Sequence, residues 1–433
     1  MKIAFKTFGC KANSTDSDAL TLEAERRGFE VVGEDERADA YVINSCTVTE
    51  AADRDARIYA TRTKRSHPLS LVAVVGCYAQ VAKDELLSLP EVDLVVGTAN
   101  KFRVLDYLTD ANDRGLWNRD QVESARGFLP ELFQGSRHSR ATIKVQDGCN
   151  YSCSFCIIPK ARGRSRSLDL GTVLGQVQEA YRQGFEEVVL TGIHLAHYGW
   201  DRGTDLLGLL SRILAEPEGP RIRLSTLDPF EIPDALIELL GVEKRLCPHF
   251  HIALQSGSDR VLKSMQRIYR AKEFVQVTQK IAGKWADTFV GVDVIVGFPG
   301  ETREDFEQTI DVLKRSYWTK LHVFPFSVRP GTKAAELRSK VPAAEIRRRV
   351  TQLLTLSAAR HGEFLESQLG KAHEAVLEKP SAQDTTLWFG HTQNYVPVVV
   401  PLANARPRAR IPVLMQKLLG ERLLAHPLTG AGF

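Results

Sequence analysis

The sequence has no apolar run that approaches the length needed to span a membrane. Its first residues, Met1 to Lys6, lead directly into a strand pattern and lack the apolar core of a signal peptide. Internal repeats and low-complexity segments are also absent. We therefore expect a cytoplasmic protein with no membrane contact, in a reducing compartment where thiols bind metals more often than they form disulfides.

Cysteine is scarce, with seven residues in 433. An odd number of thiols in so long a chain argues against the disulfide framework of small secreted proteins. Neither sign of charge is in large excess, because the net charge is only +4, and this mild basicity does not by itself indicate a nucleic-acid partner. The length and a hydrophobic content of 43% are sufficient for two or three globular domains.

Three of the cysteines lie close together, in Cys149-Asn-Tyr-Ser-Cys153-Ser-Phe-Cys156, after a strand-like run at 141–146. Thiolates are the ligands that iron–sulfur clusters require, and a short loop can supply three of them to a [4Fe–4S] cluster but not easily a fourth. One iron is then left without a protein ligand and is free to bind a small molecule. The CxxxCxxC spacing therefore predicts a cluster that takes part in chemistry.

A structural zinc site is the alternative for the same three thiols. Such sites have four Cys or His ligands, commonly in CxxC or HxxxH pairs. No second pair of either kind lies near residues 149–156. Unligated core cysteines are common one at a time, but they do not explain three at this spacing, so we favour the iron–sulfur interpretation.

The first 110 residues alternate short apolar runs with amphipathic stretches. Buried strands are predicted at 3–8, 40–43, 71–75 and 94–96, and helices at about 16–27, 50–65 and 80–88. This alternation predicts a small doubly wound α/β domain with a mostly parallel sheet. Residues 111–138 contain scattered Gly, Pro, Asn and Asp and are predicted to form a linker.

Cys10, Cys46 and Cys77 each end or follow one of these predicted strands. The C-terminal ends of parallel strands meet at one edge of a sheet, where ligands bind. We therefore predict that these three thiols hold a second cluster, again with one open iron. Three independent buried cysteines are the alternative. Cys247 has no such neighbours in the pattern and is expected to be a packing residue.

Residues 139–368 alternate strands and helices at longer intervals. Strands are predicted at 142–146, 187–191, 221–225, 249–254, 290–296 and 320–325, with a long amphipathic helix at about 343–368. This pattern predicts a partial (βα)6 barrel, whose active site lies at the C-terminal ends of the strands. The CxxxCxxC loop leaves the first strand at that end.

Residues 369–433 contain β-rich runs and predict a small β-barrel. They carry seven Lys or Arg residues against four Asp or Glu. A basic rim on such a barrel suits a phosphate backbone, and an exposed basic loop without a ligand is the alternative.

The chain resembles the radical S-adenosylmethionine (SAM) methylthiotransferase family along essentially its full length. The segments that carry the resemblance are Val145–Gly163, Leu190–His194, Leu254–Ser258, Asp293–Gly300 and Phe324–Gly331. The resemblance implies an N-terminal methylthiotransferase domain at 1–110, a radical SAM core at 139–368 and a small RNA-binding β-barrel of the TRAM type at 369–433.

Two short boxes indicate a type within the family. Gly9-Cys10-Lys11-Ala12-Asn13 and Asn44-Ser45-Cys46-Thr47-Val48-Thr49 resemble the MtaB type, which acts on N6-threonylcarbamoyladenosine at tRNA position 37. The type for isopentenyladenosine-37 has GCQMN-like and NTCSFRE-like boxes, and the type for ribosomal protein S12 has GCPKN and NTCGF. These two substrates are the alternatives.

The resemblance implies a transferase of sulfur-containing groups that uses two SAM and two [4Fe–4S] clusters. Cys149, Cys153 and Cys156 would hold the cluster that splits SAM, and the 5′-deoxyadenosyl radical would take hydrogen from C2 of the adenine. The other three cysteines would hold an auxiliary cluster whose sulfur is methylated and inserted. No catalytic residue is assigned beyond these cluster ligands.

Contacts to SAM and RNA are expected near the strand ends and in the basic tail. The residues expected to contact SAM are Phe155, Ile157, Gly192, Gln255, Ser256 and Asp293. Those expected to contact a tRNA anticodon loop are Arg162, Arg164, Arg166, Arg406, Arg408 and Arg410. An electron donor such as flavodoxin or ferredoxin and a sulfur source are also implied. The remaining hypotheses are a zinc- or RNA-binding protein that is not an enzyme, and a radical SAM enzyme without methylthiolation activity.

Overall fold

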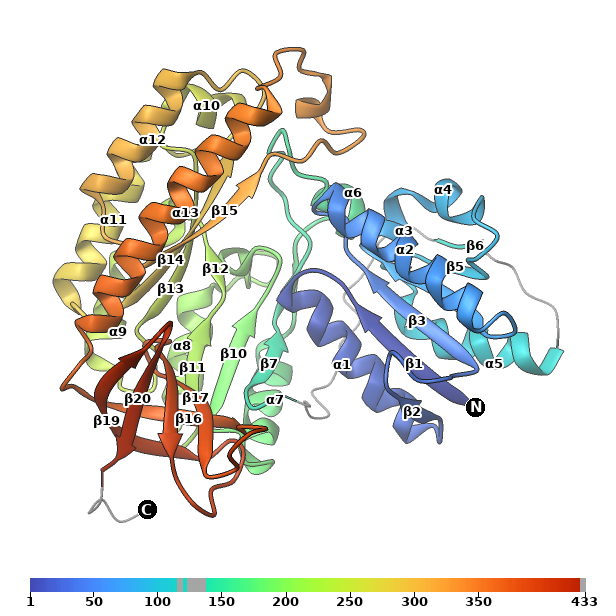
Figure 1. The fold of residues 1–433 in the computed structure, drawn as a ribbon, viewed down its shortest axis with the longest axis horizontal. Coiled ribbons are helices and arrows are strands. Elements are labelled where there is room, and N and C mark those ends of the chain that lie inside the picture. Colours follow the sequence, from blue (N-terminus) through green and yellow to red (C-terminus); the bar gives the residue numbers. More distant parts are fainter. Residues whose placement is uncertain (115–119, 123–137, 429–433) are drawn as a thin grey trace.

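The computed structural model describes residues 1–114, 120–122 and 138–428, which form three units packed against one another (Figure 1). The N-terminal unit is an α/β sandwich, the central unit is a curved sheet covered by helices, and the C-terminal unit is a small barrel. No helix among these residues is both long and apolar enough to cross a membrane.

The N-terminal unit is built on a parallel sheet with the order β2-β1-β3-β4-β5-β6. Its described strands are β1 (Lys2–Thr7), β2 (Glu30–Val32), β3 (Ala40–Ser45), β4 (Leu71–Gly76), β5 (Leu94–Val96) and β6 (Asp120–Gln121). Helices α1 (Lys11–Arg26) and α5 (Val104–Arg114) cover one face, and α2 (Glu50–Ser66), α3 (Cys77–Val81) and α4 (Lys83–Leu87) cover the other. Helices on both faces make this the doubly wound arrangement that the alternation predicts.

The predicted linker starts later than the sequence suggests. Helix α5 continues to Arg114, and β6 adds to the sheet edge because Asp120 and Gln121 pair with Val95 and Val96. An ion pair of 2.9 Å between Lys83 and Asp120 also ties β6 to the sheet. The rest of the predicted linker, 115–119 and 123–137, lies outside the described residues.

The central unit contains the six predicted strands, arranged in two parallel sheets that follow each other around an incomplete barrel (Figure 1). The first sheet has β7 (Ala141–Lys144), β10 (Glu187–Thr191) and β11 (Arg221–Leu224), and the second has β12 (Thr226–Leu227), β13 (His249–Gln255), β14 (Phe289–Val296) and β15 (Lys320–Pro325). The predicted strand 221–225 is divided at Ser225, where the chain passes from the first sheet to the second.

Seven helices longer than one turn pack on the outside of this barrel in the described part of the chain. They are α7 (Leu170–Arg182), α8 (Leu206–Leu214), α9 (Asp234–Val242), α10 (Asp259–Ser264), α11 (Ala271–Lys284), α12 (Arg303–Arg315) and α13 (Ala343–Glu366). In α8, the Asp205 side chain caps the helix by accepting from the Gly208 amide at 2.7 Å, and Leu206, Leu209 and Leu210 are buried. Burial of each such leucine stabilises the fold by about 1.5–3 kcal/mol.

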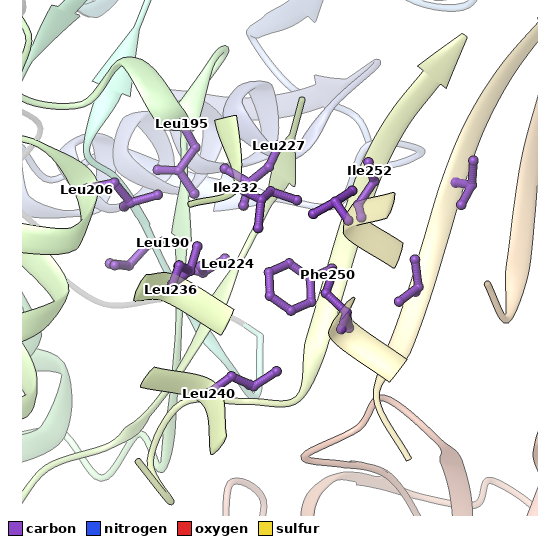
Figure 2. Packing of buried hydrophobic residues seen from close by; sticks show 14 of the residues in the cluster. Leu190, Leu195, Leu206, Leu224, Leu227, Ile232, Leu236, Leu240, Phe250 and Ile252 are labelled. Atoms are coloured by element: carbon purple, nitrogen blue, oxygen red, sulfur yellow. The ribbon is translucent and has the colours of Figure 1, made fainter. Parts of the chain in front are cut away.

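The core between strands and helices is aliphatic. Figure 2 shows Leu190 and Leu224 of the first sheet beside Leu236 and Leu240 of α9, with Phe250 of β13 next to them. The strand residues that point outward pack in this layer. Their neighbours along each strand therefore point to the interior of the barrel, where polar side chains collect.

The C-terminal unit is a closed barrel within residues 372–427, with the strand order β16-β17-β18-β20-β19. Its strands are β16 (Ala372–Pro380), β17 (Leu387–Thr392), β18 (Pro397–Pro401), β19 (Arg410–Leu419) and β20 (Arg422–Pro427). Buried and exposed residues alternate along these strands, and closure removes the unpaired edges. The predicted small β-barrel is therefore present.

Candidate active site: two cysteine sets at a domain interface

The first cysteine set lies on the loop between the short strand β8 (Gln146–Asp147) and helix α6 (Ile158–Arg162). The loop is folded tightly: the Tyr151 amide donates to Cys149 Sγ at 3.4 Å, and the Cys156 amide donates to the Cys153 carbonyl at 3.0 Å. Arg267 donates to Cys153 Sγ at 3.2 Å and is itself paired with the buried Asp228. The three thiols are therefore held in one loop with a guanidinium beside them.

The second set comes from three neighbouring strands of the N-terminal sheet. Cys10 follows β1, Cys46 follows β3 and Cys77 follows β4, so all three lie at the C-terminal edge. The strand order changes direction between β1 and β3. Doubly wound sheets bind ligands at such a point. Gly9 has φ +101°, and a Cβ there would lie 2.4 Å from Cys46 Cβ, so only glycine permits this approach.

Cys46 and Cys77 are buried, the three thiols of the loop are half-buried and Cys10 is exposed. Burial raises the pKa of Cys77 to about 11 and that of Cys156 to about 12, and neighbouring thiolates add to both shifts. A cationic cluster reverses this by binding the thiolates, so that cluster binding and deprotonation occur together.

The spacing of the thiols fits a cluster better than a single ion. Within the described residues, neither set of three sulfur atoms has all its members within 4.8 Å of one another, as ligands of one ion require. A cube of four irons and four sulfides is larger and holds its ligands farther apart. This spacing suits [4Fe–4S] clusters, although Cys149 also lies within 4.8 Å of ligand atoms of His194 and His197, so the assignment of the six cysteines as cluster ligands stays a prediction.

Arg162 connects the two sets. Its Nε donates to Cys77 Sγ at 3.2 Å, and one terminal nitrogen contacts both carboxylate oxygens of Asp147 at 3.1 and 3.2 Å. The other terminal nitrogen donates to Asn13 Oδ1 at 2.6 Å. Helix α6, which carries Arg162, packs against α3, which begins at Cys77. The side chain is only 1% exposed, so this contact spans a dry interface between the N-terminal and central units.

A buried ion cluster surrounds Arg162. Asp16 of α1 pairs with Lys101, Lys144 and Arg162, and Lys144 also lies 3.6 Å from Asp147. Although burial opposes the charge, Arg162 and Lys144 hold the pKa of Asp147 well below its usual value. Charges so deeply buried are costly unless paired, and here Asp16 of the N-terminal unit pairs with Lys144 and Arg162 of the central unit. This ion cluster therefore holds the two cysteine sets in a fixed relative position.

A second polar network lies beside Cys149, and sequence reasoning did not assign it. His194 Nε2 donates to Glu231 at 2.5 Å, Tyr151 donates to the same carboxylate at 2.7 Å, and His194 Nδ1 lies 3.9 Å from Cys149 Sγ. Burial opposes protonation of His194, but hydrogen bonds with Cys149 and Glu231 raise its pKa to about 10. The signal was available, because His194 follows the end of β10 just as the cysteines follow their strands.

The residues predicted to contact SAM lie around the same strand ends. Gln255 ends β13 with φ +61°, and Gly192 follows β10, where a Cβ would lie 2.7 Å from Gln146 Oε1. Asp293 accepts a hydrogen bond from His251 at 2.7 Å inside the barrel. Ser256 is fully buried and accepts from the Ser258 amide, so its hydroxyl serves the turn.

Two of the residues predicted to contact SAM, Phe155 and Ile157, are apolar. Phe155 packs against the buried cluster of Val261, Met265 and Phe298, and Ile157 is buried where α6 begins. Both side chains therefore support the cysteine loop, which is what their position between Cys153 and α6 requires.

The six predicted RNA-binding arginines fall into four groups. Arg162 does not reach the surface and is committed to the ion cluster, so the expectation that it contacts RNA is corrected. Arg408 lies 3.7 Å from the Phe185 ring and Arg410 pairs with Glu186 at 3.2 Å, so both join the barrel to the central unit. Arg166 is half-buried and donates to the Arg162 carbonyl at 2.7 Å. Arg164 and Arg406 are exposed.

Two family models match the chain. Residues 143–313 match the radical SAM superfamily, and residues 2–97 match an uncharacterized protein family, UPF0004. The threonylcarbamoyladenosine tRNA methylthiotransferase MtaB of Aquifex aeolicus is 41% identical over 383 residues, which cover 87% of this chain and 93% of that protein. The protein of the same name from Bacillus subtilis is 36% identical and covers 92% and 90%.

The chain belongs to the radical SAM methylthiotransferase family. The tRNA-2-methylthio-N(6)-dimethylallyladenosine synthase of Corynebacterium efficiens is also similar, at 34% identity over 86% of this chain and 74% of that protein. The radical SAM methyltransferase TsrM from Kitasatospora setae, solved with cobalamin and a [4Fe–4S] cluster, shares the fold, with a TM-score of 0.55, 15% identity and coverage of 77% and 76%. The protein is thus a radical SAM enzyme whose cofactors are SAM and [4Fe–4S] clusters.

Proposed function

We propose that this methylthiotransferase inserts a methylthio group at C2 of N6-threonylcarbamoyladenosine at position 37 of tRNA. The observation that carries the proposal is the pairing of two three-cysteine sets across one buried interface, joined by the contact of Arg162 with Cys77. A radical SAM reaction alone needs one cluster, so a second set facing the first supports a reaction that also consumes a sulfur atom. The names of the Aquifex and Bacillus relatives support the substrate.

In this proposal each set has its own task. Cys149, Cys153 and Cys156 hold the cluster that binds SAM, and the other three cysteines hold the auxiliary cluster. Together the clusters and SAM supply a radical at the substrate carbon and a sulfur atom with its methyl group. The chain's own residues position the two sets, exclude water from the interface and orient the base. In this proposal Gly192 leaves open space for SAM at the strand ends, and Gln255 and Asp293 provide polar groups there.

The C-terminal barrel is proposed to act as a TRAM-like RNA-binding unit. Arg406 is exposed on it, and the base of an anticodon loop can be turned outward to reach a protein site. An external electron donor, such as flavodoxin or ferredoxin, and a sulfur source complete the proposed partners, in a cytoplasmic setting.

The test is nucleoside analysis of tRNA from a host that lacks the activity, with and without this gene. The proposal predicts that the methylthio derivative of threonylcarbamoyladenosine appears only with the gene, and that a Cys10/Cys46/Cys77 triple alanine variant fails to produce it. Appearance of the methylthio derivative of dimethylallyladenosine instead would assign the activity named for the Corynebacterium relative. Unchanged tRNA with a modified ribosomal protein S12 would move the substrate to a protein.

A further inference from the structure

A basic cavity opens where the three units of the chain meet. It has a volume of about 440 Å³ and is lined by residues of all three: Lys11 from α1, Arg140 and Arg223 from the central unit, and Glu378 and Tyr395 from the barrel. A second cavity of about 250 Å³ adjoins it between the strands of the central unit and the C-terminal barrel, with Lys320, His251 and His322 in its wall. Lys11 and Tyr395 line both cavities, so Lys11 lies between them.

Arg140 and Arg223 of the larger cavity are already paired with acidic side chains, whereas Lys379 of the barrel and Lys11 also line it. Arg223 makes two contacts of 2.6 and 3.0 Å to the buried Glu187 and donates to barrel carbonyls. Arg140 pairs with Glu378 at 2.9 Å, and Glu378 also accepts from His391 at 2.8 Å. These cations are therefore structural, because they attach the barrel to the central unit.

The Lys11 ammonium differs from these cations. Among the described residues it has no hydrogen bond and no ion pair, and it remains open to solvent in the cavity. The backbone from which its side chain extends is fixed, because the carbonyls of Cys10 and Lys11 accept from Ser14 and Thr15 in the first turn of α1. An unpaired cation in a cavity that other cations surround favours an anionic ligand.

The position of Lys11 relates this anion to the reaction. Lys11 directly follows Cys10, a predicted ligand of the auxiliary cluster, so its side chain begins at the place from which sulfur is transferred. In adenine, C2 and C6 flank the same ring nitrogen, N1. A substituent on N6 therefore starts within one ring width of the carbon that receives the sulfur, and the adjoining cavity is available to hold it.

We propose that the Lys11 ammonium binds the carboxylate of an N6-linked carbamoyl amino acid on the substrate adenosine, so that Lys11 determines which modified base the enzyme accepts. The inference rests on the proposed function, because threonylcarbamoyladenosine carries such a carboxylate. A dimethylallyl group has no charge, and its burial against Lys11 and the imidazoles of the smaller cavity would leave these groups without partners.

The experiment compares two anticodon stem–loop RNAs that differ in one group. One carries N6-threonylcarbamoyladenosine, and the other carries the same base with the threonyl carboxylate converted to a carboxamide. Reconstituted holoenzyme is assayed anaerobically with each RNA, both for kcat/KM of methylthio insertion and for the dissociation constant without SAM. The preference for the acid over the amide is the quantity of interest, because it does not depend on the fraction of enzyme with intact clusters.

The wild type is expected to prefer the acid by about 30-fold, as removal of one member of a buried charge pair commonly costs. Lys11→Met is expected to reduce the preference nearly to one, and Lys11→Arg to restore much of it. Lys272→Met, which removes an exposed charge on α11, is the matched control and is expected to keep the wild-type preference.

Two results overturn the inference and are distinguishable. A Lys11→Met enzyme that keeps the full preference, or a Lys320→Met enzyme that alone loses it, removes the role of Lys11 while the proposed function stands. A wild type that acts on neither RNA but acts on a stem–loop with dimethylallyladenosine overturns the proposed substrate, and the inference falls with it.

Discussion

Arg162 donates from Nε to the sulfur of Cys77 at 3.2 Å, across the interface between the N-terminal and central units. The same guanidinium contacts Asp147, two residues before the first cysteine of the other set. One buried side chain therefore touches a predicted ligand of the auxiliary cluster and the base of the loop for the first cluster. The relative position of the two cysteine sets depends on this contact.

The first prediction concerns Arg162. Arg162→Met removes one partner from Asp147 and Asp16, which remain buried, so we expect the free energy of unfolding to fall by about 3–5 kcal/mol. Urea unfolding followed by circular dichroism measures the change. Arg164→Met is the matched control: it removes an exposed arginine two residues farther along the chain and is expected to change the value by less than about 0.5 kcal/mol. Equal stability of the two variants would contradict the role of Arg162.

The second prediction uses two glycines with positive φ. At Gly9, with φ +101°, a Cβ would lie 2.6 Å from Cys46 Sγ, whereas at Gly28, with φ +82°, nothing lies within 4 Å. We expect Gly9→Ala to displace Cys46 and to lower the reconstituted iron from about eight to about four per chain. Gly28→Ala is expected to cost only about 1 kcal/mol of backbone strain and to keep the iron. Full iron in Gly9→Ala would show that Cys46 is not a ligand.

The third prediction separates the clusters chemically. Anaerobic iron and sulfide analysis with Mössbauer spectroscopy is expected to give about eight irons per chain in the wild type and about four in each triple alanine variant. The Cys10/Cys46/Cys77 variant should still cleave SAM but make no methylthio product, because its first cluster is intact. The Cys149/Cys153/Cys156 variant should do neither. Four irons in the wild type that vanish in the second variant would remove the auxiliary cluster from the mechanism.

Much of the fold and both cysteine sets follow from local sequence signals. Buried parallel strands are nearly continuous apolar runs, as at 71–75, and a cysteine directly after such a run must lie at the sheet edge, as Cys77 does. The CxxxCxxC loop needs no tertiary information either. These predictions required only the period of the pattern and the direction of the chain.

Features that depend on how the units pack were not predictable in this way. Arg162 and Arg164 are two residues apart in one basic segment, and the docking of α6 on α3 buries Arg162 while Arg164 stays exposed. Likewise, Arg408 and Arg410 read as a basic rim, but the barrel uses them against Phe185 and Glu186. The sequence thus identified the basic residues but not which of them face solvent.

The last prediction is a dependence of stability on pH. Four histidines in the wall of the smaller cavity have a pKa below the usual value, in each case first because burial disfavours the cation. They are His249, His322, His361 and His391. Below about pH 6.5 the unfolded chain binds protons at these sites and the folded chain does not, so stability is complete above that pH and falls as the pH decreases.

His249 provides the measurement. It stacks on Phe289, with ring centroids 5.4 Å apart, and Arg223 and Lys11 further disfavour its protonation. Each such histidine contributes at most about 1.4 kcal/mol per pH unit, so His249→Gln should reduce the loss of unfolding free energy between about pH 6.5 and pH 5.5 by up to that amount. Urea titrations of wild type and variant at the two pH values test this. An identical loss in both proteins would contradict the prediction, because it would mean that the folded chain binds a proton at His249 as readily as the unfolded chain does.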